Sequence, residues 1–178
     1  MQIFIETERL ILRELVPADA AGIYELDSNP DVHRYLGRRP VMHIDEAQAA
    51  IANIRQQYID NGIGRWAMIE KATGDFMGWT GLKLVRTLTN HHIDYYDLGY
   101  RMIPRYWGKG YATESAVASV QYGFEQLQLQ EIYGMADVGN KASVHVLEKA
   151  GLRFIETFDF EGDAHSWLRL TRDEWERK

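Results

Sequence analysis

The junction between residues 93–103 and residues 111–127 constrains the fold of this chain more than any other part of its sequence. The first segment has a β-rich pattern and ends at Pro104, since proline cannot donate to a strand ladder. The second has apolar residues at helical spacing. A helix that begins just after a strand end offers free N–H groups and partial positive charge there. The sequence therefore predicts an anion site at this junction, most readily for a phosphate group.

The connecting loop, Arg105-Tyr106-Trp107-Gly108-Lys109-Gly110, suits a phosphate cradle. The two glycines let the backbone approach a ligand closely, and Arg105 and Lys109 add positive charge. An ordinary helix start with a glycine-rich turn explains the same residues. The spacing departs from the dinucleotide fingerprint G-x-G-x-x-G, because Thr113 stands at its third glycine, and from the Gly-Lys-Ser/Thr of NTPases.

The pattern of the whole chain predicts a mixed sheet with helices on its faces. Strands are expected over residues 8–15, 64–70, 75–85, 93–103, 131–138, 152–160 and 164–171. Helices are expected over residues 17–27, 45–60, 111–127 and 141–150. This order is typical of an α/β fold of the mixed α+β kind, with a central six- to seven-stranded sheet flanked by about four helices.

Length and composition set limits on domains and metals. The 178 residues contain no linker-like segment, so we expect a single domain over residues 1–178. There are no cysteines, which removes disulfides, thiolate metal ligands and a cysteine nucleophile. His91, His92 and Asp94 lack further ligands at defined spacing, so no metal is expected.

Charge and hydropathy set limits on partners. The net charge is -6 and no basic cluster is evident, so we expect no nucleic-acid partner, although a cationic substrate is tolerated. The N-terminus lacks the features of a signal peptide, and no run approaches the roughly 20 apolar residues of a membrane span. We therefore expect a cytoplasmic protein without a membrane partner. The residues leave the oligomeric state open, a homodimer included.

The loop resembles the R/Q-x-x-G-x-G/A signature of the GNAT acetyltransferase superfamily, with Arg105, Gly108 and Gly110 at the fixed positions. Other segments resemble its ribosomal-protein N-acetyltransferase branch, in family order. These segments are Thr7-Glu8-Arg9-Leu10-Ile11-Leu12-Arg13 with Asp19, Gly78-Trp79-Thr80-Gly81-Leu82, Asp97-Leu98-Gly99-Tyr100, and Asn140-Lys141-Ala142-Ser143 with Glu148-Lys149-Ala150-Gly151-Leu152. The resemblance covers nearly the whole chain. It implies the GNAT fold and transfer of acetyl from acetyl-coenzyme A to a primary amine.

The resemblance also implies how the chain would hold acetyl-coenzyme A. The Met102 N–H would polarise the thioester carbonyl, and Met102 and Ile103 would pair with the pantetheine arm as a neighbouring strand does. Both are equally well explained as core residues. The expected cofactor-binding residues are Tyr100, Met102, Ile103, Arg105, Gly108, Lys109, Gly110, Ala112, Thr113, Asn140 and Ser143.

Asp97 is the residue that we expect to assist deprotonation of the acceptor amine. An alkylamine has a pKa near 10.4 and is mostly protonated at neutral pH, so it must lose a proton before it attacks a thioester. Relatives often carry glutamate at this position, and the shorter aspartate favours a water relay. Asp97 as a solvent-facing residue, or as the partner of Arg101, is the structural alternative, and Asp94 is a weaker candidate base.

Asn140 and Ser143 are expected at the thiol end. Asn140 precedes a predicted helix and can cap it, and in the resembling family the matching asparagine also contacts the pantetheine or acetyl end. Many relatives have a general-acid tyrosine seven residues later, where this chain has Leu147. Ser143 is the expected substitute, directly or through water. Alternatively no acid is needed, because a thiol pKa near 8.5 makes the thiolate a tolerable leaving group.

The acceptor stays open at this stage. A protein N-terminus fits the resembling branch, and a polyamine, amino acid or drug amine fits equally well. By analogy Tyr35 and Trp66 would line its pocket, although packing residues have the same composition. A catalytically silent acyl-coenzyme A-binding module is the main alternative, kept open by Leu147. A structural interaction domain with the same fold is the third.

Overall fold

The computed structural model of the chain describes residues 1–177. Over this range it contains eight strands, five α-helices and three short 3-10 helices. The strands are β1 (Ile3–Glu6), β2 (Leu10–Arg13), β3 (Trp66–Glu70), β4 (Phe76–Val85), β5 (Tyr95–Met102), β6 (Glu131–Asp137), β7 (Arg153–Phe160) and β8 (Asp163–Thr171). The helices are α1 (Ala20–Asp27), α2 (Ile44–Asn61), α3 (Tyr111–Glu125), α4 (Lys141–Lys149) and α5 (Arg172–Glu176), with 3-10 helices η1 (Pro17–Asp19), η2 (Val32–Tyr35) and η3 (Pro104–Tyr106).

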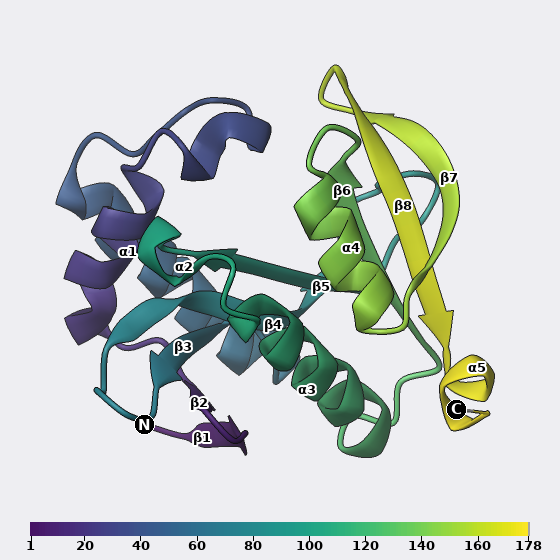
Figure 1. Ribbon diagram of the computed structural model, residues 1–178, viewed down its shortest axis with the longest axis horizontal. Coiled ribbons are helices and arrows are strands. Elements are labelled where there is room, and N and C mark those ends of the chain that lie inside the picture. The colour runs from purple at the N-terminus through teal and green to yellow at the C-terminus, as the bar shows by residue number, and fades with distance from the viewer. Residues whose placement is uncertain (178) are drawn as a thin grey trace.

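All eight strands join one sheet, in the order β1-β2-β3-β4-β5-β6-β8-β7. Every neighbouring pair is antiparallel except β5 and β6, which run parallel. The parallel pair lies in the middle of the sheet and divides it into a β1–β5 part and a β6–β8 part (Figure 1). This arrangement confirms the mixed sheet and the α/β fold class expected from the sequence.

Helices cover both faces of the sheet. Ile23 of α1 and Ile51 of α2 pack with Ala67 of β3 in one hydrophobic cluster. Val120 and Phe124 of α3 belong to a larger cluster with strand residues. Helix α4 contacts α3 and packs over β6 and β7 (Figure 1). Among residues 1–177 no helix has the length and apolar character needed to cross a membrane.

Two short elements that the sequence analysis does not predict, β1 and α5, bring the numbers of strands and α-helices to eight and five. Strand β1 has only four residues at the edge of the sheet, too few for a strand pattern to emerge. Helix α5 has five residues, fewer than the window in which helical periodicity is visible. Its start does carry a readable signal, because the Thr171 hydroxyl and the Glu174 backbone and carboxylate form a capping box.

Element boundaries otherwise shift by a few residues. Strand β5 begins at Tyr95 rather than 93, because Asp94 has a φ of 53°, outside the strand region, and lies in a bend. Helix α2 begins at Ile44, so Asp45 is not its cap. The Glu46 carboxylate instead accepts from the backbone N–H groups of Met42 and His43, each at 3.0 Å. Gly62 ends that helix in the left-handed conformation, as its glycine predicts.

Candidate functional site

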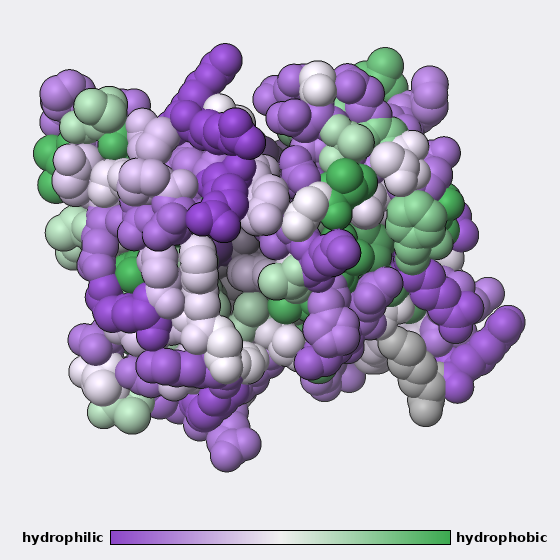
Figure 2. Space-filling view, turned by 45° about the horizontal axis from the view of Figure 1, so that its top comes forward, coloured by the Kyte–Doolittle hydropathy of each residue, from purple (hydrophilic) through white to green (hydrophobic). Residues whose placement is uncertain are grey.

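Strands β5 and β6 pair at a single position and then separate. Asp97 lies opposite Tyr133, and no later residue of β5 has a β6 partner. Figure 1 shows the two strands diverging beyond this point, and Figure 2 shows the surface hollowed between the two parts of the molecule. Backbone groups along a diverging strand edge are free to pair with an extended ligand. The separation therefore creates a slot that opens along the second half of β5.

Met102 and Ile103, at the end of β5, differ in what they offer to this slot. The Ile103 N–H donates to the Met77 carbonyl at 2.9 Å, and its carbonyl accepts from the Tyr106 N–H at 3.0 Å. Both Ile103 groups are thus used within the protein, so the expectation that Ile103 pairs with pantetheine is wrong for its backbone. Since antiparallel ladders alternate, the Met102 N–H points away from β4 toward the slot. The Met102 carbonyl accepts from the Trp107 indole at 2.8 Å.

The glycine loop follows directly. Gly108 and Gly110 have φ values of 73° and 83°, which glycine adopts without steric cost. Gly110 is the N-cap of α3, so Ala112 and Thr113 lie in the first helical turn, where N–H groups lack intrahelical partners. At Gly108 a Cβ would meet no atom within 4 Å. The loop therefore leaves open space at Gly108 and leads into a helix start of the kind that binds anions.

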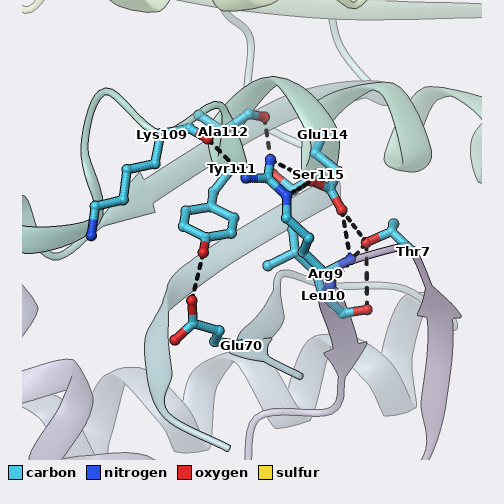
Figure 3. Close-up of polar contacts among 9 residues, drawn as sticks. All are labelled: Thr7, Arg9, Leu10, Glu70, Lys109, Tyr111, Ala112, Glu114 and Ser115. Carbon is cyan, nitrogen blue, oxygen red and sulfur yellow. Dashed lines mark hydrogen bonds and ion pairs between the residues drawn. The ribbon is translucent and has the colours of Figure 1, made fainter. Parts of the chain in front are cut away.

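The two basic residues of the loop are placed differently. Arg105 forms an exposed ion pair with Glu25 of α1, which raises the pKa of its guanidinium. The Arg105 side chain is therefore directed to α1 and adds less positive charge to the loop than the sequence suggested. Lys109 is exposed, with its ammonium 5.8 Å from the Tyr106 ring centroid. Figure 3 shows the Lys109 side chain extended away from Arg9.

Behind the loop lies a polar network that sequence reasoning missed (Figure 3). Arg9 pairs with Glu114 of α3 through Nε at 2.7 Å, and its Nη1 donates to the Lys109 carbonyl at 2.9 Å. Thr7 donates to the other Glu114 oxygen at 2.6 Å. The Tyr111 hydroxyl donates to Glu70 of β3 at 2.5 Å. The sequence contains these residues, but nothing in their spacing reveals the contacts, which join residues 41 positions apart for Tyr111 and Glu70 and 100 to 107 positions apart for the others.

Asp97 is buried and ion-paired with Arg65, so it is neither a solvent-facing residue nor the partner of Arg101. Arg101 instead pairs with Asp27 of α1 at 2.7 Å. Burial raises the pKa of the Asp97 carboxyl, and Arg65 opposes this shift. One carboxylate oxygen, Oδ1, is buried without a hydrogen-bond partner among the described residues. Asp94, the weaker candidate, is exposed in the bend before β5.

The structure brings Ser143 of α4 close to Tyr100 of β5, across the slot. Burial raises the pKa of the Tyr100 phenol, and the neighbouring Ser143 hydroxyl partly opposes the rise. The Asn140 side chain accepts from the Ser143 N–H at 3.2 Å, which confirms it as the cap of α4. Leu147 is 2% exposed and lies beside Gly134, so an apolar core residue occupies the position expected for the tyrosine acid.

The two aromatic residues considered for an acceptor pocket separate in the structure. Trp66 is fully buried and stacks on Phe4 with ring centroids 5.2 Å apart, so its expected pocket role is wrong. Tyr35 of η2 lies beside Gly139, the residue before Asn140, and so connects the N-terminal part of the chain to the loop between β6 and α4. Within residues 1–177 no group of three or more metal-ligating side chains occurs.

Comparisons with known proteins agree with this geometry. The family model described as an acetyltransferase (GNAT) domain matches residues 9–153. The uncharacterized N-acetyltransferase YoaA of Bacillus subtilis is 32% identical over 149 residues, which cover 84% of this chain and 82% of that protein. The FsC-acetyl coenzyme A-N(2)-transacetylase of Aspergillus fumigatus is 31% identical over 185 residues, covering 97% of this chain and 78% of the relative.

Solved structures show the same fold. A spermidine N-acetyltransferase from Vibrio cholerae, in complex with CoA and spermine, superposes with a TM-score of 0.74. The sequence identity is 21%, and the match covers 95% of this chain and 99% of that one. At this identity the similarity concerns the fold alone.

Proposed function

The chain belongs to the GNAT acetyltransferase family and is an N-acetyltransferase, and we propose that it transfers acetyl from acetyl-coenzyme A directly to a primary amine. The observation that carries this proposal is the slot between β5 and β6 that ends beside the positive-φ glycine loop. An extended pantetheine arm fits an unpaired strand edge, and a pyrophosphate fits the amide groups at the start of α3.

Backbone groups hold the donor in this proposal. The N–H groups of residues 108–113 bind the pyrophosphate, with Lys109 adding charge, and the Met102 N–H faces the thioester carbonyl. A donor aimed at the carbonyl oxygen stabilises the negative charge that develops there as the amine attacks. The carbonyl of Met102 is held by the Trp107 indole, and this contact fixes the Met102–Ile103 peptide at the slot.

Asp97 and Ser143 are the proposed groups for proton transfer. Asp97 takes the amine proton through a water, because its carboxylate is buried beside Arg65 and its Oδ1 remains free to accept. Ser143 donates toward the departing sulfur, with Tyr100 next to it and Asn140 orienting its helix turn. The amine nitrogen forms a bond to the carbonyl carbon as the carbon–sulfur bond breaks, and the electron pair leaves on sulfur.

The acceptor class remains a choice between a peptide N-terminus and a small-molecule amine. Relatives of this chain include the spermidine N(1)-acetyltransferase of Escherichia coli and the putative ribosomal N-acetyltransferase YdaF of Bacillus subtilis, each 28% identical. The proposed acceptor entrance is beside Arg101, in the second half of β5, where Arg101 pairs with Asp27 of α1.

A thiol-release assay tests the proposal. Purified protein is mixed with acetyl-coenzyme A and a panel of polyamines, amino acids, drug amines and short peptides, and free coenzyme A is followed with a thiol reagent. Amine-dependent thiol release is the expected result. Binding of coenzyme A by calorimetry without release by any amine would instead favour the silent acyl-coenzyme A-binding module. No binding at all would favour an interaction domain and overturn the donor assignment.

A further inference from the structure

Arg9, Glu114 and the Lys109 carbonyl form a polar network behind the glycine loop, on the side away from the slot. We propose that Arg9 is a positioning residue for acetyl-coenzyme A, which aims the Gly110 N–H at the pyrophosphate by holding the Lys109 carbonyl. This inference rests on the donor proposed above. It assigns to the segment before β2 a part in binding, although that segment lies outside the slot.

Arg9 is held in a fixed orientation by three partners. Its Nε and Nη2 contact Glu114 Oε2 at 2.7 and 2.6 Å, and its backbone N–H donates to Glu114 Oε1 at 3.0 Å. Its guanidinium lies over the Tyr111 ring, 4.3 Å from the centroid. The remaining nitrogen, Nη1, donates to the Lys109 carbonyl at 2.9 Å. One planar guanidinium thus joins the first turn of α3 to the loop before it (Figure 3).

The hydrogen bond from Arg9 to the Lys109 carbonyl also determines where the Gly110 N–H points. In a trans peptide the C=O and N–H point in opposite directions. Because the Lys109 carbonyl points to Arg9, the N–H of Gly110 in the same peptide points to the other side of the loop. Glycine populates positive and negative φ about equally, so the φ of 83° at Gly110 leaves the orientation of this peptide to be selected by its contacts, and the Arg9 hydrogen bond to the Lys109 carbonyl is such a contact.

The charge of Arg9 is a weaker explanation than its geometry. Glu114 offsets the guanidinium charge at contact distance, so the pair adds little net positive potential to the loop. The pair also lies on the side of the Lys109 peptide opposite the Gly110 N–H. Arg9 therefore acts through the backbone, and its removal should affect the pyrophosphate specifically.

Two acetyl donors distinguish an effect of Arg9 on pyrophosphate binding from an effect on the fold as a whole. Acetyl-coenzyme A carries the pyrophosphate, and S-acetyl-pantetheine lacks it. For Arg9→Gln we expect the KM for acetyl-coenzyme A to rise about tenfold, the size of one lost hydrogen bond, with kcat at saturation unchanged. With S-acetyl-pantetheine the kcat/KM should equal that of the wild type. A calorimetric titration with coenzyme A gives the same comparison without an acceptor.

Arg9→Lys and Arg13→Gln complete the design. Lysine keeps the ion pair with Glu114 and hence the fold, but a single ammonium does not span Glu114 and the Lys109 carbonyl as the guanidinium does, so weak coenzyme A binding should persist. Arg13→Gln breaks the pair between Arg13, at the far end of β2, and Asp19 of η1, and should lower thermal stability without changing coenzyme A affinity. Folded Arg9→Gln and Arg9→Lys proteins with wild-type coenzyme A affinity would overturn the inference. Failure of the wild type itself to bind coenzyme A would overturn the proposed function instead.

Discussion

Arg65 and Asp97 form a buried ion pair at the point where β5 leaves β6. Arg65 Nη2 contacts Asp97 Oδ2, and Arg65 Nη1 donates to the Asp97 carbonyl at 2.6 Å. The side chains are 10% and 12% exposed, so solvent screens the pair only weakly. Arg65 thereby fixes the carboxylate and its backbone together, and leaves Oδ1 as the oxygen that can accept a proton.

Substitution of Asp97 by asparagine should lower kcat while leaving coenzyme A affinity nearly unchanged. The amide cannot take a proton from the amine, and positioned bases contribute about 10²–10⁴-fold to such reactions. The variant also leaves Arg65 buried without a counter-charge, which costs about 3–5 kcal/mol of unfolding free energy. Steady-state kinetics at saturating donor, on protein shown to be folded, give the answer.

The pH profile supplies a control for that assignment. The carboxylate is the active form, so kcat must fall on acidification as Asp97 takes up a proton. Burial raises the pKa of Asp97, and Arg65 opposes the rise, so the fall should occur at a higher pH than for an exposed aspartate. Asp97 would be ruled out as the base if the kcat of the wild type did not fall at low pH. The same would follow if kcat fell over the same pH range in Asp97→Asn.

Ser143→Ala tests the thiol end of the reaction. If the hydroxyl donates toward the departing sulfur, kcat should fall by about tenfold or more, with little change in the KM for acetyl-coenzyme A. Tyr100→Phe and the double variant then form a cycle. Because the two hydroxyl groups are neighbours, their effects should be non-additive. Full activity of Ser143→Ala would remove serine from the mechanism and leave the thiolate to depart unassisted.

The sequence identified the local features of the site better than its long-range contacts. The strand end before Pro104 and the cap at Asn140 could be assigned correctly because each depends on neighbouring residues alone. Arg65, the partner of Asp97, is 32 positions away in the sequence. The register of the sheet brings the two side chains together, and local sequence does not determine that register.

The same limit explains Arg105 and Arg9. Arg105 was expected to add charge to the loop, but its partner Glu25 lies 80 positions earlier on α1. Arg9 was part of a family-like segment without an assigned role, and its partner lies 105 positions later. Ion pairs of this kind follow from tertiary packing, for which the sequence pattern gives no spacing rule. Ile103 was misassigned because strand parity determines which backbone groups face the slot.

Glu114→Gln should make the protein less stable at pH 7 and less sensitive to acid. Burial raises the pKa of this carboxyl, but hydrogen bonds from Thr7 and Arg9 outweigh it and leave the pKa lowered. A lowered folded-state pKa stabilises the protein above the unfolded value, near 4.3, and this stabilisation is lost as the pH falls through the folded-state pKa. Urea unfolding measured at several pH values between 7 and 3 gives the unfolding free energy at each pH. At pH 7 the variant should be about 1–3 kcal/mol less stable than the wild type, and its unfolding free energy should change less with pH. An equal pH dependence of the unfolding free energy in both proteins would show that the Glu114 carboxylate does not stabilise the fold.

Gly110→Ala and Gly74→Ala form a matched pair that tests the loop. The φ values are 83° and 79°, so each alanine costs about 1 kcal/mol of unfolding free energy through backbone strain. Gly74 lies in the turn before β4 with no atom within 4 Å of a Cβ, whereas a Cβ at Gly110 would lie 3.4 Å from Arg9 Nη2. Alanine at 110 also disturbs the N-cap of α3, where the pyrophosphate would bind. We therefore expect similar thermal shifts for both variants, but a raised KM for acetyl-coenzyme A only for Gly110→Ala. If both variants keep the wild-type KM, the pyrophosphate does not bind at this loop.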